Sequence, residues 1–319
     1  MLWFMTDNIE KARALAATFA PRAADWDRSR TYCWPNVAEL ADAGLMGMTI
    51  PKDWGGQGAS CLETVQVIEE IARACTLSAR IVVEANMGAI SAVMAYGTDA
   101  QRAFAAPLVL AGDKPAICIT EPEAGSAATE MTTTARRMGD HYVLNGTKHW
   151  ITGGGVSKLH LIFARVLAED GTEEGITGFI VLHDPDNGLE HDGFQIVRHE
   201  RTMGLCGMPE AELKFTDLEV PEDMVLRPPS GLKRGFADLM TAYNSQRVGA
   251  GTIAMGVAAG ALDHAKRYLT ERHQFGRPLA EFQGLQWMLA DMDAGVHASR
   301  LMLHEACLLY TSPSPRDEQ

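Results

Sequence analysis

The hydrophobic side chains of this sequence follow a helical period, then a strand period, then a helical period again. Residues 1–110 carry apolar side chains three and four positions apart, as at Leu62, Val65 and Ile68, which is typical of one helix face. Residues 115–220 alternate with a period of two, which indicates strands. Separate blocks of helices and strands predict an α+β fold rather than repeated βαβ units.

The pattern also predicts individual elements and domains. Helices are expected at 37–45, 62–75, 79–96, 236–272 and 283–309, and strands at 159–166, 176–182 and 211–215. These blocks predict an all-α domain over 1–113, a β-domain over 114–225 and a C-terminal helical region over 226–309. The last residues, 310–319, carry no helical signal, because prolines at 313 and 315 end a helix.

Composition excludes several classes of protein. The net charge is −13, which argues against nucleic acid as a partner, although a few local arginines can still bind an anionic ligand. Six cysteines at 33, 61, 75, 118, 206 and 307 form no CxxC pair, so we expect a reduced cytoplasmic protein without a disulfide framework or zinc site. Residues 1–5 are too short for a signal peptide core, and we expect no membrane span.

Two short motifs concentrate the chemistry. The first ends an apolar run at Thr120 and turns through Ser126. In the second, Asn145-Gly146 lies between alternating residues, which predicts a hairpin joining strands 141–144 and 148–152. Hydroxyl groups and backbone N–H groups beside Trp150 suit a flat heterocyclic cofactor. The alternative is an ordinary β-sandwich with a half-buried tryptophan.

These motifs resemble the two flavin-binding motifs of the acyl-CoA dehydrogenase family. They read Thr-Glu-Pro-x-Ala-Gly-Ser at 120–126 and Asn-Gly-x-Lys-x-Trp-Ile-Thr at 145–152. The resemblance extends to Ile-Pro at 50–51, Trp-Gly-Gly-Gln-Gly at 54–58, Met-Gly at 203–204 and Glu-Arg-His-Gln-Phe-Gly-Arg at 271–277. It implies a helical domain, a middle β-domain, a C-terminal four-helix bundle, FAD, an acyl-CoA substrate and a homotetramer.

The resemblance also assigns roles to single residues. It implies that the flavin ring is held by Ile117, Ile119, Thr120, Ser126, Trp150 and Thr152. It implies that Arg272, Gln274 and Phe275 reach the FAD of a neighbouring subunit, and that acyl-CoA contacts Ser126, Tyr243, Asn244 and Arg247. Arg272 could instead offset a helix dipole, and Arg247 could be a solvated helix arginine.

The position of the catalytic base departs from the family pattern. Family dehydrogenases remove a proton with a glutamate, either beyond the last residue here or at the position held by Gln246, which cannot act as a base. Strings at 114–128, 150–166, 242–251 and 274–288 most resemble one subgroup, the 3-sulfinopropanoyl-CoA desulfinases. The resemblance implies that Arg80 binds the sulfino group. The alternative is an ion pair between Arg80 and Glu84 on a solvated helix face.

Three functional hypotheses follow from the sequence. The first is an FAD-containing desulfinase that releases sulfite and leaves propanoyl-CoA, with Arg80 and Gln246 as its catalytic residues. The second is an α,β-dehydrogenase that passes electrons to an electron-transfer flavoprotein. The third is a non-catalytic flavin- or CoA-binding fragment. The family has two further helices, so we expect a truncated chain with a foreign tail at 310–319, and the truncation can leave it inactive. The loop residue Cys206, where the family usually has arginine, is expected to be a packed thiol.

Overall fold

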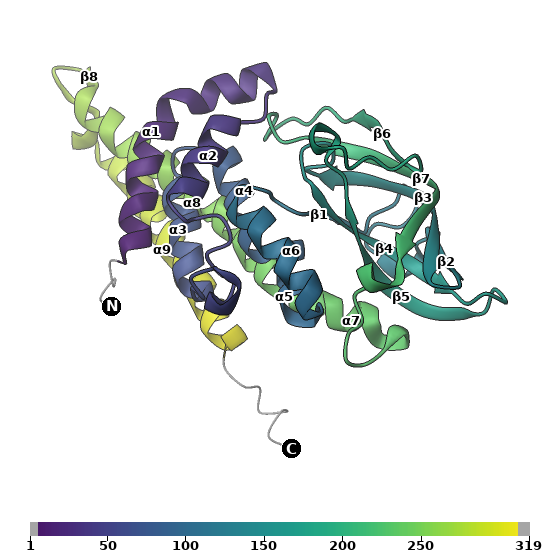
Figure 1. Cartoon of the computed structure of the whole chain (residues 1–319). Helices are drawn as coiled ribbons and strands as arrows, with labels where there is room; N and C mark the ends of the chain where they lie inside the picture. Colours follow the sequence, from purple (N-terminus) through teal and green to yellow (C-terminus); the bar gives the residue numbers. More distant parts are fainter. Residues whose placement is uncertain (1–5, 312–319) are drawn as a thin grey trace. The chain divides into compact units, whose positions relative to one another are not determined.

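The computed structural model describes residues 6–311, and it confirms the predicted order of helices, strands and helices (Figure 1). The first block comprises α1 (Asp7–Ser29), α2 (Trp34–Asp42), α3 (Cys61–Ala72), α4 (Thr76–Met87), α5 (Ala89–Tyr96) and α6 (Asp99–Leu110). The strands are β1 (Ala116–Cys118), β2 (Thr134–Met138), β3 (His141–Thr152), β4 (Leu159–Leu167), β5 (Glu173–Leu182), β6 (Phe194–His199) and β7 (Glu210–Pro221). The last block comprises α7 (Leu232–Ala242), α8 (Asn244–Glu271), the short strands β8 (His273–Gln274) and β9 (Arg277–Pro278), and α9 (Gln283–Thr311).

Several helix boundaries differ from the prediction. Helices α2 and α3 each end three residues earlier than expected. The helix expected at 79–96 is two helices, α4 and α5, with the break at Gly88. The helix expected at 236–272 is interrupted at Tyr243, between α7 and α8. Helix α9 continues to Thr311, so the first two residues of the expected tail are helical. Residues 312–319 and 1–5 lie outside the described part of the chain.

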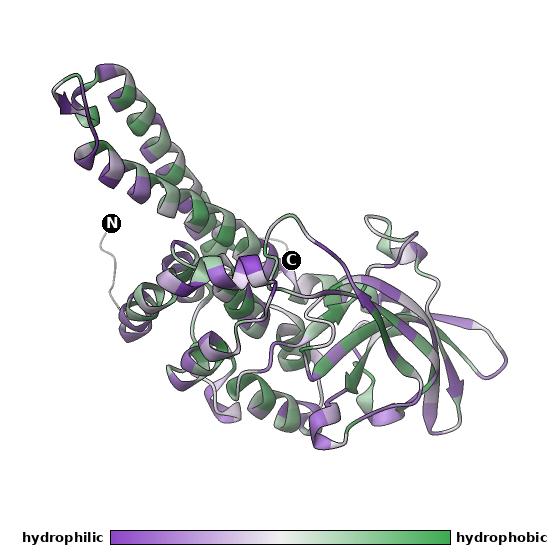
Figure 2. Ribbon diagram, turned by 90° about the horizontal axis from the view of Figure 1, so that it is seen from above, coloured by the Kyte–Doolittle hydropathy of each residue, from purple (hydrophilic) through white to green (hydrophobic). Residues whose placement is uncertain are grey.

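The chain divides into two compact units. The helical unit consists of Met1–Ala24, Ser60–Arg80 and Arg247–Gln319, and the sheet unit consists of Asp25–Ala59 and Ile81–Gln246. In the helical unit, α8 and α9 lie side by side (Figures 1 and 2) and bury a small core of Met255, Ala259, Leu262 and Val296.

The sheet unit is organised around β4. The strand order is β1-β4-β2-β3-β7-β6, and β5 also pairs with β4. Strands β1 and β2 pair with β4 in parallel, whereas β5 is antiparallel to it. Aliphatic and aromatic side chains of the strands form the core, in which Tyr142 and Phe179 meet edge to face with ring centroids 5.3 Å apart. This rigid core fixes the strand ends that carry the candidate site.

The hairpin predicted at Asn145-Gly146 is wrong. Strand β3 runs without interruption from His141 to Thr152, and the residues at 145–146 form an irregularity in its pairing with β7. The Asn145 side chain accepts a hydrogen bond from Asp217 N (2.9 Å) and donates one to the Asp217 carboxylate (3.0 Å). Gly146 has φ 152°, and a Cβ there would lie 2.4 Å from Thr133 Oγ1. Glycine is therefore needed for a close approach and not for a turn.

The real hairpin turn lies six residues earlier. Strands β2 and β3 are joined by Gly139 and Asp140, because Met138 and His141 are the last paired residues. Gly139 has φ 68°, as a two-residue hairpin turn with glycine at its first position requires.

One stretch, Thr76–Tyr96, is long and apolar enough to cross a membrane by length and composition. No membrane span was expected from the sequence. Of the most apolar 18-residue window in this stretch, 83% is buried inside the protein, which is what the core helices of a folded domain show.

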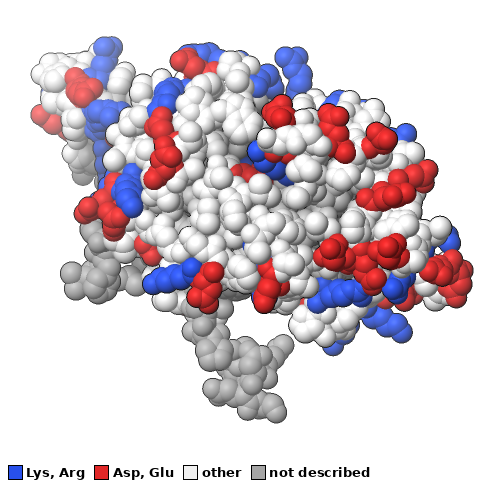
Figure 3. All heavy atoms as spheres, in the orientation of Figure 1, with Lys and Arg blue, Asp and Glu red and all other residues white. Residues whose placement is uncertain are grey.

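On the face of the molecule shown in Figure 3, acidic and basic side chains are interspersed.

Candidate functional site

A buried ion pair joins the two sequence motifs. Lys148 Nζ lies 2.8 Å from Glu121 Oε1 and donates a second hydrogen bond to Ile119 O at 2.9 Å. Glu121 also accepts bonds from the backbone N–H groups of Thr132 and Thr133. Burial raises the pKa of Glu121, but the bonds from Lys148, Thr133 and Thr132 outweigh burial and lower that pKa to about 2. The pair therefore anchors the end of the first motif against β3.

Trp150 is displayed by a bulge in β3. His149 and Trp150 together oppose the single residue Glu212 of β7, between the pairs Lys148–Leu213 and Ile151–Ala211. Trp150 has φ 62°, which is uncommon for a bulky residue, and 53% of it is exposed. Such local strain persists only where the surroundings enforce it, and it is frequent at functional sites. The bulge turns the indole outward, where its ring stacks on His149 with centroids 4.6 Å apart.

The end of β1 lies beside this tryptophan. The backbone N–H group of His149 donates to Thr120 O at 2.9 Å. This bond holds Thr120 beside the residue that precedes Trp150. Ile117 and Ile119 are half-buried, Thr120 is half-buried, and Ser126 is exposed in the following loop. Apolar side chains, a hydroxyl group and an exposed aromatic face thus lie together, and these groups fit the ring of a flavin.

Thr152 is engaged differently from the expectation. Its hydroxyl group lies 2.9 Å from both carboxylate oxygens of Glu210 and donates its proton to that carboxylate. A hydroxyl group has a single proton, so a bond from Thr152 to a flavin edge requires its rotation away from Glu210. Its carbonyl oxygen accepts a bond from the buried Lys114 at 3.3 Å.

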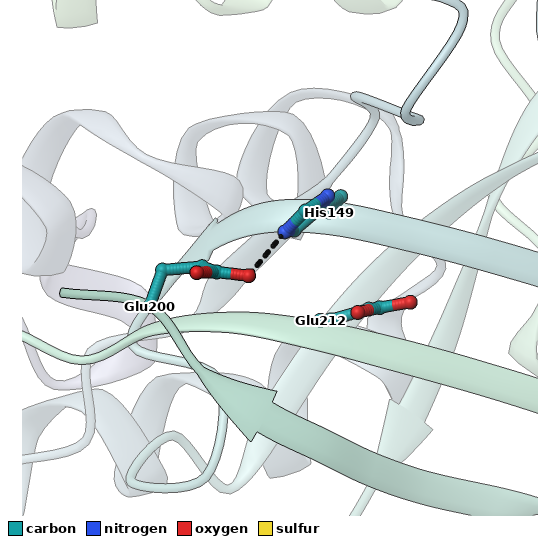
Figure 4. A group of neighbouring side chains, drawn as sticks. All are labelled: His149, Glu200 and Glu212. Carbon is teal, nitrogen blue, oxygen red and sulfur yellow. Dashed lines mark hydrogen bonds and ion pairs between the residues drawn. The ribbon is translucent and has the colours of Figure 1, made fainter.

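A second cluster adjoins the tryptophan. His149, Glu200 and Glu212 place their ligand atoms within 4.8 Å of one another, and Figure 4 shows Glu200 and His149 pointing together. His149 Nε2 lies 2.9 Å from Glu200 Oε1. Arg198 bonds Glu200 at 2.6 Å and pairs with Glu212 at 2.9 Å. The guanidinium group thus supplies the positive charge that a divalent cation would otherwise bring to these two carboxylates.

The residue in the place of a catalytic base contacts a buried carboxylate. Gln246 Nε2 lies 3.2 and 3.1 Å from Glu84 Oε1 and Oε2. Glu84 is only 2% exposed. Nearby, the hydroxyl group of Tyr243 is buried and has no hydrogen-bond partner within the described part of the chain. Burial, with a further electrostatic contribution from Cys118 and Glu84, raises the pKa of Tyr243, so this hydroxyl group remains a neutral donor.

The structure also shows the surroundings of Arg80 and Arg247, the two arginines assigned to the substrate. Arg80 precedes Glu84 by one helical turn on α4, and its side chain is partly buried. Because Glu84 is buried, the alternative of an ion pair on a solvated helix face is wrong. Asn244 is the first residue of α8, and both Asn244 and Arg247 are exposed.

The segment after α8 forms a tight hairpin. Phe275 and Gly276 have φ 55° and 76°, which is the geometry of a type I′ turn between Gln274 and Arg277. Phe275 is 93% exposed. Arg272 directly follows the last residue of α8 and is exposed beside this turn. The structure thus groups Arg272, Gln274 and Phe275 on one exposed hairpin of the helical unit.

Models of known protein families match three consecutive parts of this sequence. The N-terminal domain of acyl-CoA dehydrogenases matches residues 8–113, the middle domain matches 116–218 and the C-terminal domain matches 233–316. The chain belongs to the acyl-CoA dehydrogenase family. This confirms the resemblance seen in the motifs and makes the protein an enzyme of that family. Membership implies an acyl-CoA substrate and a flavin cofactor.

Individual members of the acyl-CoA dehydrogenase family differ in their sequence identity to this chain. A 3-sulfinopropanoyl-CoA desulfinase of Variovorax paradoxus is 60% identical over 297 residues, which are 93% of this chain and 74% of that protein. A short-chain specific acyl-CoA dehydrogenase of Clostridium acetobutylicum is 33% identical, with 98% of this chain and 81% of that protein covered. Butyryl-CoA dehydrogenase from Megasphaera elsdenii has a similar structure, with a TM-score of 0.87 at 29% identity over 97% of this chain and 80% of that one.

Three contributors to the site were not found from the sequence. Lys148 and Glu121 were quoted as parts of the motifs but were given no role, and Glu84 was considered only as a surface partner of Arg80. The signal for the first pair was one charged residue of opposite sign in each motif, Glu121 after the apolar run and Lys148 in the second motif. Nothing in the sequence indicates the contact between Glu84 and Gln246, which are 162 positions apart.

Proposed function

We propose that this protein is a 3-sulfinopropanoyl-CoA desulfinase that contains FAD. The net reaction breaks the carbon–sulfur bond of the sulfinate with one water molecule and yields propanoyl-CoA and hydrogen sulfite. One hydrogen of water goes to the carbon, and the hydroxide goes to sulfur, so atoms and charge balance without an external electron acceptor. The 60% identity to a desulfinase of this name supports the substrate. The contact between Gln246 and Glu84 is the structural observation that carries the proposal.

The chemistry of Gln246 suits an anionic substrate. An amide nitrogen carries two N–H donors, and Glu84 occupies only one direction from it. The other N–H group can bond a sulfino or thioester oxygen without adding negative charge. A glutamate at this position would stand about 3 Å from a buried carboxylate and would repel a sulfinate. Glu84 therefore acts as a positioning residue that fixes the orientation of the Gln246 amide.

Arg80 is the proposed partner of the sulfino group. A sulfinate is an anion, and an anion in a desolvated pocket needs a fixed cation with good hydrogen bonds. Tyr243 offers a neutral, buried hydroxyl group for the acyl thioester. Ser126, Asn244 and Arg247 are assigned to the CoA portion, and the exposure of all three leaves them accessible to it.

The flavin is assigned to the surface around Trp150. Ile117 of β1 and the residues just after that strand, Ile119 and Thr120, would contact the ring. Ser126 and Thr152 would reach its polar edges. FAD can accept a hydride from an acyl-CoA, but the proposed net reaction needs no such acceptor. The hairpin with Arg272, Gln274 and Phe275 would reach FAD in a neighbouring subunit, because a guanidinium group suits a diphosphate.

The same proposal includes a homotetramer in the cytoplasm. Several large apolar side chains of α9 are exposed, among them Trp287, Met288, Met302 and Leu309. An apolar stripe of this kind marks an association surface. The cytoplasmic location is proposed from the cysteine spacing, which forms no CxxC pair.

Dehydrogenation is the alternative function, favoured by the 33% identity to a short-chain acyl-CoA dehydrogenase. It requires a base and an electron-transfer flavoprotein as acceptor. We would mix the flavin-loaded wild type and Gln246→Glu with butanoyl-CoA under anaerobic conditions and record flavin absorbance. We expect no bleaching in either, because Glu84 forces the new carboxyl group to hold its proton. Rapid bleaching of the wild-type flavin would favour the dehydrogenase.

A further inference from the structure

Two cysteines of the helical unit are held in contact. Cys61 and Cys307 are 246 positions apart in the sequence, yet their sulfur atoms lie 3.2 Å apart. A disulfide bond requires about 2.05 Å between sulfur atoms, so an approach of roughly 1 Å would suffice. Cys307 is buried and Cys61 is half-buried, so Cys61 is the more exposed residue of the two.

An independent contact fixes the register of these two thiols. Arg300 of α9 donates to both oxygens of Glu69 on α3, at 2.7 to 3.1 Å, and the Glu69 side chain is 1% exposed. Cys61 lies eight residues before Glu69, and Cys307 lies seven residues after Arg300. The two contacts thus lie about two turns apart on antiparallel helices. The same packing that orders the ion pair brings the sulfur atoms together.

The surroundings also make Cys61 reactive. Cys61 is the first residue of α3, and Ser60 caps that helix by accepting a bond from Glu63 N. A thiolate is favoured at a helix N-terminus, where the N–H dipoles point toward it. The hydrogen bond with Cys307 lowers the pKa of the Cys61 thiol, although burial raises it. The same bond, together with burial, raises the pKa of Cys307. Cys61 is therefore the attacking thiol and Cys307 the resolving thiol.

We propose that Cys61 and Cys307 form a reversible, redox-active pair that small disulfides such as oxidised glutathione convert to an intramolecular disulfide. The Cys61 thiolate attacks one glutathione sulfur atom, the glutathione disulfide breaks, and one reduced glutathione leaves with a proton. The Cys307 sulfur then attacks Cys61, and the second reduced glutathione leaves. The two protein thiols lose two electrons and two protons. The glutathione disulfide takes up these electrons and protons and becomes two molecules of reduced glutathione.

The cross-link would connect the start of α3 to the last turns of α9. It would close a loop of 246 positions, which restricts the unfolded chain and raises the melting temperature of the oxidised protein. This site is independent of the substrate assignment. A failure of the cysteine proposal would leave the desulfinase proposal unchanged, and the reverse also holds.

The test incubates the full chain with oxidised glutathione and maps disulfides by peptide mass spectrometry without reduction. We expect the wild type to lose two of its six thiols, to yield the linked peptides of Cys61 and Cys307, and to recover both thiols on addition of dithiothreitol. Cys307→Ser should stop at a glutathione adduct on Cys61. The control Cys206→Ser, which removes a half-buried thiol of the sheet unit, should form the same link as the wild type.

Three results would overturn the proposal. The first is a wild type whose Cys61 stops at the glutathione adduct, as in Cys307→Ser. The second is a wild type that leaves both thiols unreacted or links separate chains. The third is a spread of disulfides among all six cysteines that matches a urea-denatured sample, because the folded protein must select one pair.

Discussion

Lys148 Nζ and Glu121 Oε1 lie 2.8 Å apart with both side chains buried, and this contact joins the two motifs from which the site is built. Glu121 belongs to the loop that follows β1, whereas Lys148 belongs to β3. The ion pair fixes Thr120 and Trp150 relative to each other, although neither charged side chain is exposed enough to meet a ligand. Its role is to position the neighbours that do.

Removal of the lysine should therefore destabilise the sheet unit. Lys148→Met leaves the Glu121 carboxylate buried without its counter-ion, which costs about 3–5 kcal/mol in the free energy of unfolding. Flavin content should fall in parallel. The matched control is Lys266→Met, which breaks the exposed pair with Asp293 and should cost no more than about 1 kcal/mol. Urea unfolding measures the free energy of unfolding of the two variants. Equal losses of stability in both would argue against the anchoring role of Lys148.

The same carboxylate predicts a dependence of stability on pH. The pKa of Glu121 is about 2 in the folded protein, below its ordinary value of 4.5, so the folded state favours the charged form. A lowered pKa contributes stability that is present above about 4.5 and is lost as the pH falls toward 2, up to about 3 kcal/mol. Glu121→Gln should flatten this part of the curve. The test is to measure unfolding free energies of the wild type and Glu121→Gln between pH 5 and pH 2. Parallel curves for the two proteins would contradict this role of Glu121.

Trp150 offers a test of the flavin surface. Trp150→Ala removes an exposed aromatic face next to Thr120, so we expect loss of bound FAD with little change in the melting temperature of the apoprotein. Trp34 is also 53% exposed, which makes Trp34→Ala a matched control that should retain FAD. The visible absorbance of the purified variants gives the flavin content. Equal flavin content in the two variants would remove Trp150 from the binding site.

Arg80 carries the substrate assignment. Arg80→Ala removes a charge-assisted hydrogen bond to the sulfino group, which should cost roughly 2–4 kcal/mol in transition-state binding, or about 30- to 1000-fold in kcat/KM. Arg80→Lys should restore only part of the activity, because an ammonium group lacks the forked donors of a guanidinium group. Steady-state sulfite release measures the effect, with flavin content as the check on folding. Sulfite release at the wild-type level in Arg80→Ala would exclude this role.

Much of the fold could be predicted because the hydrophobic period reports directly on burial. The order of blocks, the strands β4 and β5 and the long helix α9 all appear in the pattern of apolar residues. The failures have physical reasons. Asn145-Gly146 has the residues of a hairpin turn, but the glycine is required by the nearness of Thr133, a contact that depends on tertiary packing.

The site was predictable only in part, for the same reason. Motifs place Thr120, Trp150 and Thr152 on neighbouring strand segments, since they are local in sequence. The strained backbone of Trp150 depends on its pairing with β7, and the contact of Gln246 with Glu84 depends on two helices meeting. No local pattern encodes either relationship. Long-range partners of buried charged residues are the part of such a site that only the structure supplies.

The central claim is tested most directly by sulfite release from 3-sulfinopropanoyl-CoA under anaerobic conditions, with no electron acceptor present. Purified, flavin-loaded protein would be mixed with the thioester, and sulfite and propanoyl-CoA would be measured over the same time course. We expect many turnovers, with one sulfite and one propanoyl-CoA formed for each substrate molecule consumed. Absence of sulfite, or turnover that stops until an electron acceptor is added, would contradict it.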